Sequence, residues 1–196
     1  MLFRSDNMAS STSLARYTKT AIVLHWLIAI LIIGNVVLAL SVDAFPKDFE
    51  RPIINLHKSI GITVLGLAIM RLLWRFAHKP PELPGAYKPW EVKAAHAAHW
   101  LLYLVIFALP LSGWAHDSAW KGAAENPMSL FNLIPFPRIS LIMDLDADTK
   151  EYLHDLFFVI HSSFAYLLYV LFALHVAGAL KHQFMDKEAE LERMLP

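Results

Sequence analysis

Four long apolar segments constrain this chain more than any other feature of its sequence. They lie at about residues 20–40, 54–76, 94–115 and 154–180 of a chain of 196 residues. Each segment is close to the ~20 residues that an α-helix needs to cross a bilayer. The chain as a whole is 57% hydrophobic, which is more than an ordinary soluble domain carries. The sequence therefore predicts an all-α fold, a transmembrane four-helix bundle.

Charge and cysteine content exclude several classes of protein. The formal net charge is zero, which argues against nucleic-acid binding. The chain has no cysteine, so disulfides, thiolate-bound metals and iron–sulfur clusters are excluded. The first apolar segment lacks a small-residue cleavage site, and we expect it to be a retained helix.

The distribution of basic residues predicts the orientation of the bundle. With four spans, both termini and the middle connection share one side, and the other side carries six Lys and Arg among ten Asp and Glu. The basic residues of the first side are Arg4, Arg16, Lys19, Arg71, Arg75, Lys79, Lys88, Lys93, Lys181, Lys187 and Arg193. Because basic residues concentrate in cytoplasmic loops, both termini are predicted to be cytoplasmic.

The predicted domain organisation follows from these spans. We expect a mobile cytoplasmic N-terminus at residues 1–15, the transmembrane domain at 16–185 and a cytoplasmic tail at 186–196. A long outer loop, at about 117–152, contains the apolar stretch NPMSLFNLIPFPRISLIM, which three prolines interrupt. We expect this stretch to lie along the membrane surface or to fold over the outer mouth of the bundle, and not to form a fifth span.

Two histidines in the last apolar segment are the first indication of chemistry. His161 and His175 are fourteen positions apart, which places them within about 40° of one helix face and roughly 21 Å apart along the axis. Ionisable groups at such depth are costly and are usually functional. One helix therefore presents an imidazole towards each side of a bilayer whose hydrocarbon core is about 30 Å thick.

Depth pairs these two histidines with two others. His25 lies near the cytoplasmic end of the first segment, at the depth of His175, and His57 lies near the outer end of the second, at the depth of His161. Two stacked sites with two imidazoles each match the ligands of two six-coordinate b-type haems. Zinc fits less well because a tetrahedral site needs three or four protein donors. The alternative for each histidine alone is a hydrogen bond to a neighbouring helix.

Several stretches of the chain resemble the bacterial cytochrome b561 family. They are RYTKTAIVLHWLIAILI, RPIINLHKSIGITVLGLAIMRLLWR, AHAAHWLLYLVIFALPLSGWAHDSA, FALHVAGALKHQF and the closing RMLP. The resemblance covers nearly the whole chain from Arg16 on, and the family is related to the b-type subunits of nickel–iron hydrogenases and formate dehydrogenases.

The resemblance implies a bundle in the bacterial inner membrane that holds two haems b. His25 and His175 would ligate the cytoplasmic-side haem, and His57 and His161 the periplasmic-side haem. It also implies electron transfer between the quinone pool and a partner outside, and members have been assigned superoxide:ubiquinone oxidoreductase activity. The outer loop is the part least typical of the family.

Further basic and histidine residues are candidates for supporting roles. Arg71, Arg75 and Arg16, together with Tyr17, lie at the right depth to hold the propionates of the inner haem; the alternative is that they reach lipid headgroups. His182 and His99, with His96 as a further candidate, are predicted to bound a ubiquinone site and to carry its protons; the alternative is that headgroups hydrate them. We expect solvated side chains at His78, His116 and His154.

Two functional hypotheses follow, and they differ in class. In the first, the protein is an oxidoreductase that takes electrons from superoxide or another small reductant. In the second, it is a membrane anchor and electron conduit for a separate periplasmic redox protein, such as a dehydrogenase, a hydrogenase or a c-type cytochrome. The acidic excess on the outer side would repel superoxide unless Lys58, Arg51 or Arg138 reverses the field locally. A third hypothesis, a membrane protein without cofactor, would give a colourless protein.

Overall fold

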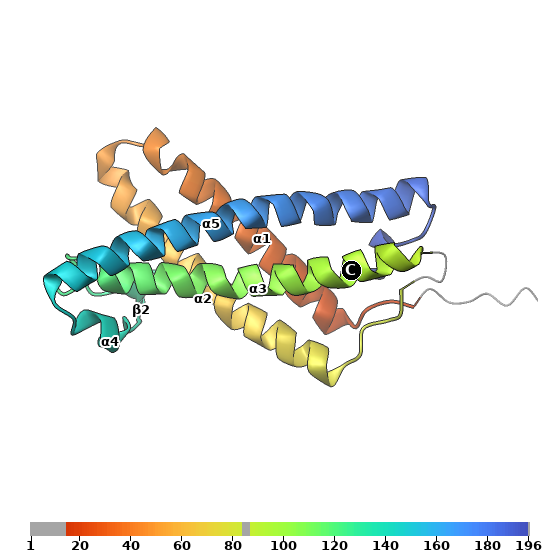
Figure 1. The fold of residues 1–196 in the computed structure, drawn as a ribbon, viewed down its shortest axis with the longest axis horizontal. Coiled ribbons are helices and arrows are strands. Elements are labelled where there is room, and N and C mark those ends of the chain that lie inside the picture. Colours follow the sequence, from red (N-terminus) through yellow and green to blue (C-terminus); the bar gives the residue numbers. More distant parts are fainter. Residues whose placement is uncertain (1–14, 84–86, 196) are drawn as a thin grey trace, which may run out of the picture.

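Four long helices form the protein, and the computed structural model describes residues 15–83 and 87–195 of the chain. The long helices are α1 (Lys19–Ser41), α2 (Lys47–Ala77), α3 (Pro89–Ala119) and α5 (Ala147–Leu180) (Figure 1). All four are long and apolar enough to cross a membrane. The predicted all-α transmembrane four-helix bundle is therefore confirmed. The predicted mobile N-terminus lies outside the described residues, except for Ala15.

Two of the helices begin before the apolar segments, because polar residues cap their N-termini. Thr18 caps α1, where its hydroxyl accepts a hydrogen bond from the Ala21 amide at 3.3 Å. Asp146 caps α5 in the same way for the Thr149 amide at 2.9 Å, so that α5 starts seven residues before the apolar run. Hydrogen bonds from the Thr149 amide and hydroxyl lower the pKa of Asp146.

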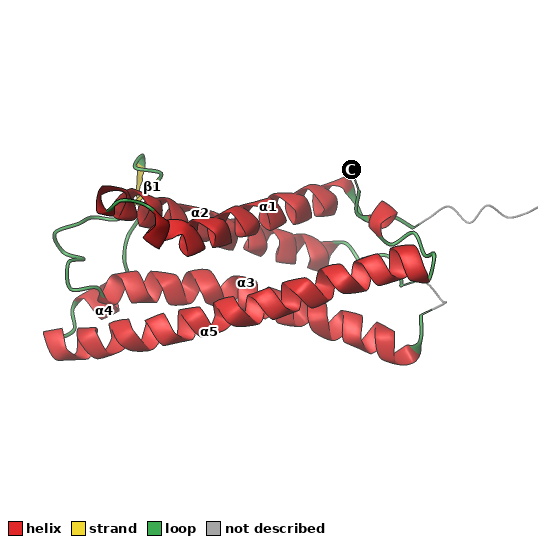
Figure 2. Cartoon of the chain, turned by 90° about the horizontal axis from the view of Figure 1, so that it is seen from above, coloured by secondary structure: helices red, strands yellow, loops and turns green. Residues whose placement is uncertain are grey.

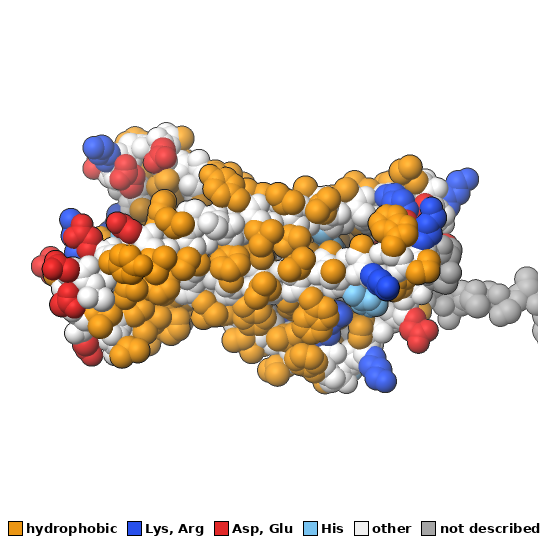
Figure 3. Space-filling view, viewed as in Figure 1, with side chains coloured by type: hydrophobic (Ala, Val, Ile, Leu, Met, Phe, Trp, Pro, Cys, Tyr) orange, Lys and Arg blue, Asp and Glu red, His pale blue; other side chains and the backbone are white. Residues whose placement is uncertain are grey.

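The helices pack in two layers, α1 against α2 and α3 against α5, and α2 also packs against α3 (Figure 2). Arg16 bonds the carbonyl of Leu195, so both ends of the described chain lie at one end of the bundle. We call this the inner end and the opposite one the outer end. Figure 3 shows an apolar surface over the middle of the bundle, with Asp and Glu gathered at the outer end and Lys and Arg more frequent at the inner end. This surface is the one that a bilayer would cover.

The shorter elements lie at the two ends of the bundle. A 3₁₀ turn (Val42–Ala44) joins α1 to α2, a π-helical turn (Lys181–Met185) continues α5, and a 3₁₀ turn (Leu191–Arg193) lies close to the C-terminus. The outer loop holds an antiparallel pair, β1 (Ser129–Leu130) and β2 (Ile134–Pro135), and the short helix α4 (Ser140–Met143). Met128 and Ile142 of this loop are buried. The loop therefore folds over the outer mouth.

Ser59 of α2 is the link that holds the hairpin in place. Its fully buried hydroxyl donates to the Asn55 carbonyl at 2.8 Å and accepts from the Phe131 amide at 2.9 Å. Phe131 has a φ of 52°, a backbone conformation that a bulky side chain disfavours. The Ser59 hydroxyl therefore supports a strained turn.

We expect Ser59→Ala to lower the free energy of unfolding by about 1–3 kcal/mol, because the Phe131 amide would lose its buried acceptor. The measurement is unfolding in a denaturing-detergent titration, combined with limited proteolysis of the outer loop. Ser163→Ala is the matched control, since that exposed hydroxyl, within the described part of the chain, bonds the Val159 carbonyl of its own helix. Equal stability of the two variants would contradict this role of Ser59.

Candidate functional site

Two pairs of histidines join the two layers of the bundle. The ring centroids of His25 (α1) and His175 (α5) are 6.2 Å apart, and those of His57 (α2) and His161 (α5) are 6.1 Å apart. The ring planes cross at 74° and 77°. The structure thus brings each of the two α5 histidines, His161 and His175, together with the histidine predicted at the same depth.

The spacing within each pair suits two imidazoles that share one metal ion. A metal–imidazole nitrogen bond is about 2 Å long and the ring centre lies about 1 Å further on, so two opposed ligands have centroids about 6 Å apart. The described residues contain no group of three or more His, Cys, Asp or Glu that could hold a metal. Two nitrogens alone do not complete a zinc site, but they do complete an iron whose other four ligands come from a porphyrin. The residues therefore fit a haem.

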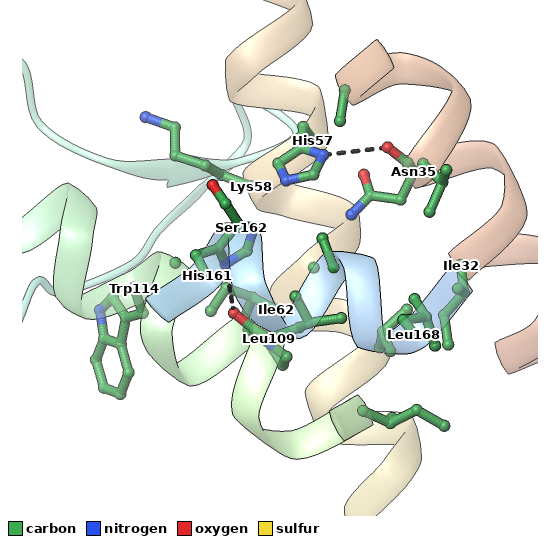
Figure 4. A pocket seen from close by; sticks show the side chains of 18 of the residues that line it. Ile32, Asn35, His57, Lys58, Ile62, Leu109, Trp114, His161, Ser162 and Leu168 are labelled. Atoms are coloured by element: carbon green, nitrogen blue, oxygen red, sulfur yellow. Dashed lines mark hydrogen bonds between the residues drawn. The ribbon is translucent and has the colours of Figure 1, made fainter. Parts of the chain in front are cut away.

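Backbone carbonyls set the tautomer of the outer pair. His57 donates from Nδ1 to the Asn35 carbonyl at 3.2 Å, and His161 donates from Nδ1 to the Leu109 carbonyl at 3.0 Å (Figure 4). Because a carbonyl only accepts, Nδ1 carries the proton in both rings and Nε2 keeps its lone pair. The Ser112 hydroxyl adds a contact of 3.2 Å to Nδ1 of His161. Such contacts are those that orient metal-ligating histidines.

The outer pair borders a cavity of ≈ 370 Å³ with mainly apolar walls. Two features of its wall are adapted to an occupant. The side-chain oxygen of Asn35 is buried without a hydrogen-bond partner among the described residues. A Cβ at Gly113 would lie 3.2 Å from Cε1 of His161, so a glycine there leaves room for the imidazole. Sequence reasoning missed both residues, although a lone polar Asn35 inside an apolar segment was a usable signal.

Two charged side chains line the outer cavity, and a third pairs with one of them. Asp117 of α3 pairs with Lys58 of α2 at 3.0 Å and with Arg138 of the outer loop at 2.8 Å. All three side chains are largely buried, and the group, which we call the outer charge cluster, has a net charge of +1. Arg51 instead stacks on Trp120, 4.1 Å from the ring centroid. Lys58 and Asp117 line the cavity, and Arg138 pairs with Asp117, so the cluster as a whole has one positive charge in excess.

The predicted propionate-binding residues surround a second cavity, of ≈ 140 Å³, at the inner end. Among the described residues, its wall includes four cationic side chains and no carboxylate. These are Arg16, Arg71, Arg75 and Lys79. Arg71 donates to the Ala21 carbonyl and the Tyr103 hydroxyl, both at 3.2 Å, and Arg75 lies over the ring of Tyr103. Tyr17 also lines the cavity, and burial raises the pKa of its hydroxyl. An anionic group would be stabilised here.

The two histidines predicted to bound the quinone have different neighbours. The ring of His99 lies 5.6 Å from that of His175. His182 bonds Asp186 at 2.7 Å and stacks on Tyr87 at 4.0 Å, while a hydrogen bond from Lys181 lowers the pKa of Asp186. His96 is exposed. The quinone site bounded by His182, His99 and His96 therefore stays a prediction.

The three histidines predicted to be solvated differ in their exposure. His78 is exposed and stacks on Trp74. His116 and His154 are half-buried, their ring centroids are 4.0 Å apart, and His116 donates to the His154 carbonyl at 2.9 Å. The early start of α5 explains this, because it places His154 two turns inside the helix, next to α3.

Comparison with known proteins supports one family. A model of the family described as prokaryotic cytochrome b561 matches residues 16–196. Cytochrome b561 homolog 2 of Escherichia coli K12 is 33% identical over 190 residues, which cover 96% of this chain and 95% of the relative. The relative named cytochrome b561 homolog 1, from the same organism, is 31% identical over 184 residues, covering 92% and 97%.

A third relative carries an activity in its name. The probable superoxide oxidase CybB of Yersinia pestis is 28% identical over 186 residues, covering 92% of this chain and 96% of the relative. The match of the family model to almost the whole chain, together with four membrane-length helices, makes this a multi-pass membrane protein. The chain belongs to the prokaryotic cytochrome b561 family of b-type membrane cytochromes.

Proposed function

We propose that the protein holds two haems b and transfers electrons through the membrane between a donor at its outer end and ubiquinone near its inner end. The observation that carries this proposal is that two histidine pairs connect the two layers, with ring centroids 6.2 Å apart in the inner pair and 6.1 Å apart in the outer pair. Fourteen residues of α5 separate the two couples, about 21 Å along the helix. When bound, the haems would supply one-electron carriers.

The residues of the chain hold these groups and control their surroundings. Nε2 of His57 and of His161 is free for an iron, because the Asn35 and Leu109 carbonyls keep the proton on Nδ1. The wall of the outer cavity is mainly apolar. Arg71, Arg75 and Arg16 stabilise the propionates at the inner end. His182 and His99 serve ubiquinone from separate positions, as proton carriers.

We further propose that superoxide is the donor, that the membrane is the bacterial inner membrane and that the inner end faces the cytoplasm. The name of the Yersinia relative supports the donor, and the outer charge cluster supplies the attraction that an anion needs. The cationic inner end supports the orientation. In the balanced reaction, two superoxide ions lose one electron each and one quinone gains two electrons and two protons.

The outer loop favours the electron conduit as a second candidate function. Leu133 and Leu141 are 82% and 79% exposed at the outer end, and exposed apolar side chains of this kind often mark a contact site. A periplasmic redox protein that docks there would deliver electrons in place of superoxide.

The experiment is a haem assay followed by mixing with an enzymatic superoxide source. We expect two haems b per chain, rapid reduction of haem by superoxide and reoxidation by a soluble ubiquinone. Added superoxide dismutase is the control and should abolish the reduction. Two haems that superoxide does not reduce would contradict the superoxide proposal and favour the conduit. A colourless protein would overturn the haem assignment.

A further inference from the structure

The last residues of the chain form a strap across the inner end. We call residues 188–195 the C-terminal strap. Arg193 is its centre and is only 2% exposed. Its guanidinium donates to the Ala15 carbonyl at 3.0 Å, to the Glu82 carbonyl at 2.6 Å and to the Glu190 carboxylate at 3.2 Å. A buried guanidinium is costly unless its donors are satisfied. Here they join the N-terminal segment, the α2–α3 connection and the strap.

The strap reaches the inner histidine pair through Trp26. The indole N–H of Trp26 donates to the Met194 carbonyl at 2.7 Å, and the indole ring lies edge-on to the His25 ring at 5.5 Å. The residue after Arg193 therefore fixes the side chain that lies against one of the two inner imidazoles. A displacement of the strap would free this indole and change the surroundings of His25.

The strap also holds one wall of the inner cationic cavity. The Tyr17 amide donates to the Arg193 carbonyl at 3.2 Å, and the Arg193 guanidinium lies over the Tyr17 ring, 5.9 Å from its centroid. Arg16 donates to the Leu195 carbonyl. Arg16 and Tyr17 both line the cavity. The backbone of the strap thus positions the Arg16 side chain at the cavity.

We propose that Arg193 is a positioning residue that raises the reduction potential of the inner haem alone. It does so through the strap, which keeps Trp26 against His25 and Arg16 at the cationic cavity. This inference rests on the proposed function, in which His25 and His175 hold that haem. Exclusion of water and nearby positive charge both favour the reduced form, because reduction removes a positive charge from the iron. The outer pair lies fourteen residues earlier along α5, about 21 Å from the inner pair.

The test is a spectroelectrochemical titration of the detergent-solubilised holoprotein. The ratio of reduced to oxidised haem is measured for each haem at its own wild-type midpoint potential. In Arg193→Ala we expect this ratio to fall about tenfold for the inner haem and to change less than about twofold for the outer haem. Trp26→Phe keeps an aromatic side chain but replaces the indole by a smaller ring without the N–H that donates to Met194, and it should lower the same ratio about threefold. Glu192→Ala, the neighbouring exposed side chain, is the matched control and should leave both haems unchanged. The His161→Ala and His175→Ala variants show which of the two reduction steps in the titration belongs to which haem.

The outcomes separate this inference from the proposed function. A wild-type protein without two haems overturns the proposed function. Two haems that shift equally in Arg193→Ala, or not at all, overturn only the role of Arg193. If Arg193→Ala does not fold, Trp26→Phe decides: an unchanged inner haem in that variant overturns the link from the strap to His25.

Discussion

His161→Ala protein is expected to retain one haem per chain in place of two, and to lose at least about 99% of its superoxide-dependent quinone reduction. The outer haem would have one axial imidazole left, and the Leu109 carbonyl and Ser112 hydroxyl, which orient His161, would have no ligand to hold. The inner pair, fourteen residues further along α5, would keep its own ligands. The measurement is the haem-to-protein ratio, with the optical spectrum of the haem that remains.

Two further variants make this result specific. His175→Ala should remove the inner haem and leave the outer one, so that the two single-haem spectra add up to that of the wild type. His154→Ala is the matched control, because His154 lies on the same helix, one heptad before His161, and packs on His116. It should keep two haems. Retention of both haems by His161→Ala, or loss of both in His154→Ala, would contradict the assignment.

The bundle could be predicted from the sequence because a membrane demands long apolar helices and leaves few alternatives. The grouping of His25 with His175, and of His57 with His161, was also accessible, because depth along a spanning helix can be counted in residues. Neither argument uses a contact between distant parts of the chain, and this is why both can be made without a structure.

Contacts between distant residues are what the sequence concealed. Nothing in the sequence connects Arg193 to Ala15 and Glu82, and the strap was predicted only as a tail. The grouping of His99 with His182 used depth alone, whereas partners decide where a side chain points: Tyr87 and Asp186 hold His182, and His99 lies against His175. The outer charge cluster likewise depends on how the loop folds back to bring Arg138 to Asp117.

The outer charge cluster predicts opposite effects of two neutralising substitutions. Lys58→Met lowers the net charge of the cluster from +1 to 0, and Asp117→Asn raises it to +2. If superoxide enters beside this cluster, the bimolecular rate of haem reduction should fall about tenfold in the first variant and rise severalfold in the second, since local fields of this kind change association rates by about 10–10³. Stopped-flow mixing with superoxide at several ionic strengths measures both rates.

Salt and a distant lysine distinguish attraction from damage to the fold. Both effects should shrink as ionic strength rises, because mobile ions screen charges over about 10 Å at 0.1 M. Lys47→Met removes one positive charge at an exposed position of the same end and should change the rate less than about twofold. Haem content must stay at two per chain as a check on the fold, since Asp117→Asn keeps an acceptor oxygen for only one of Lys58 and Arg138 and removes a buried negative charge. Equal losses of rate in Lys58→Met and Asp117→Asn would show that packing at the cluster, and not its field, limits the reaction. An unchanged rate in both variants would show that electrons do not enter beside the cluster. It would favour entry from a partner protein docked at the exposed leucines of the outer loop.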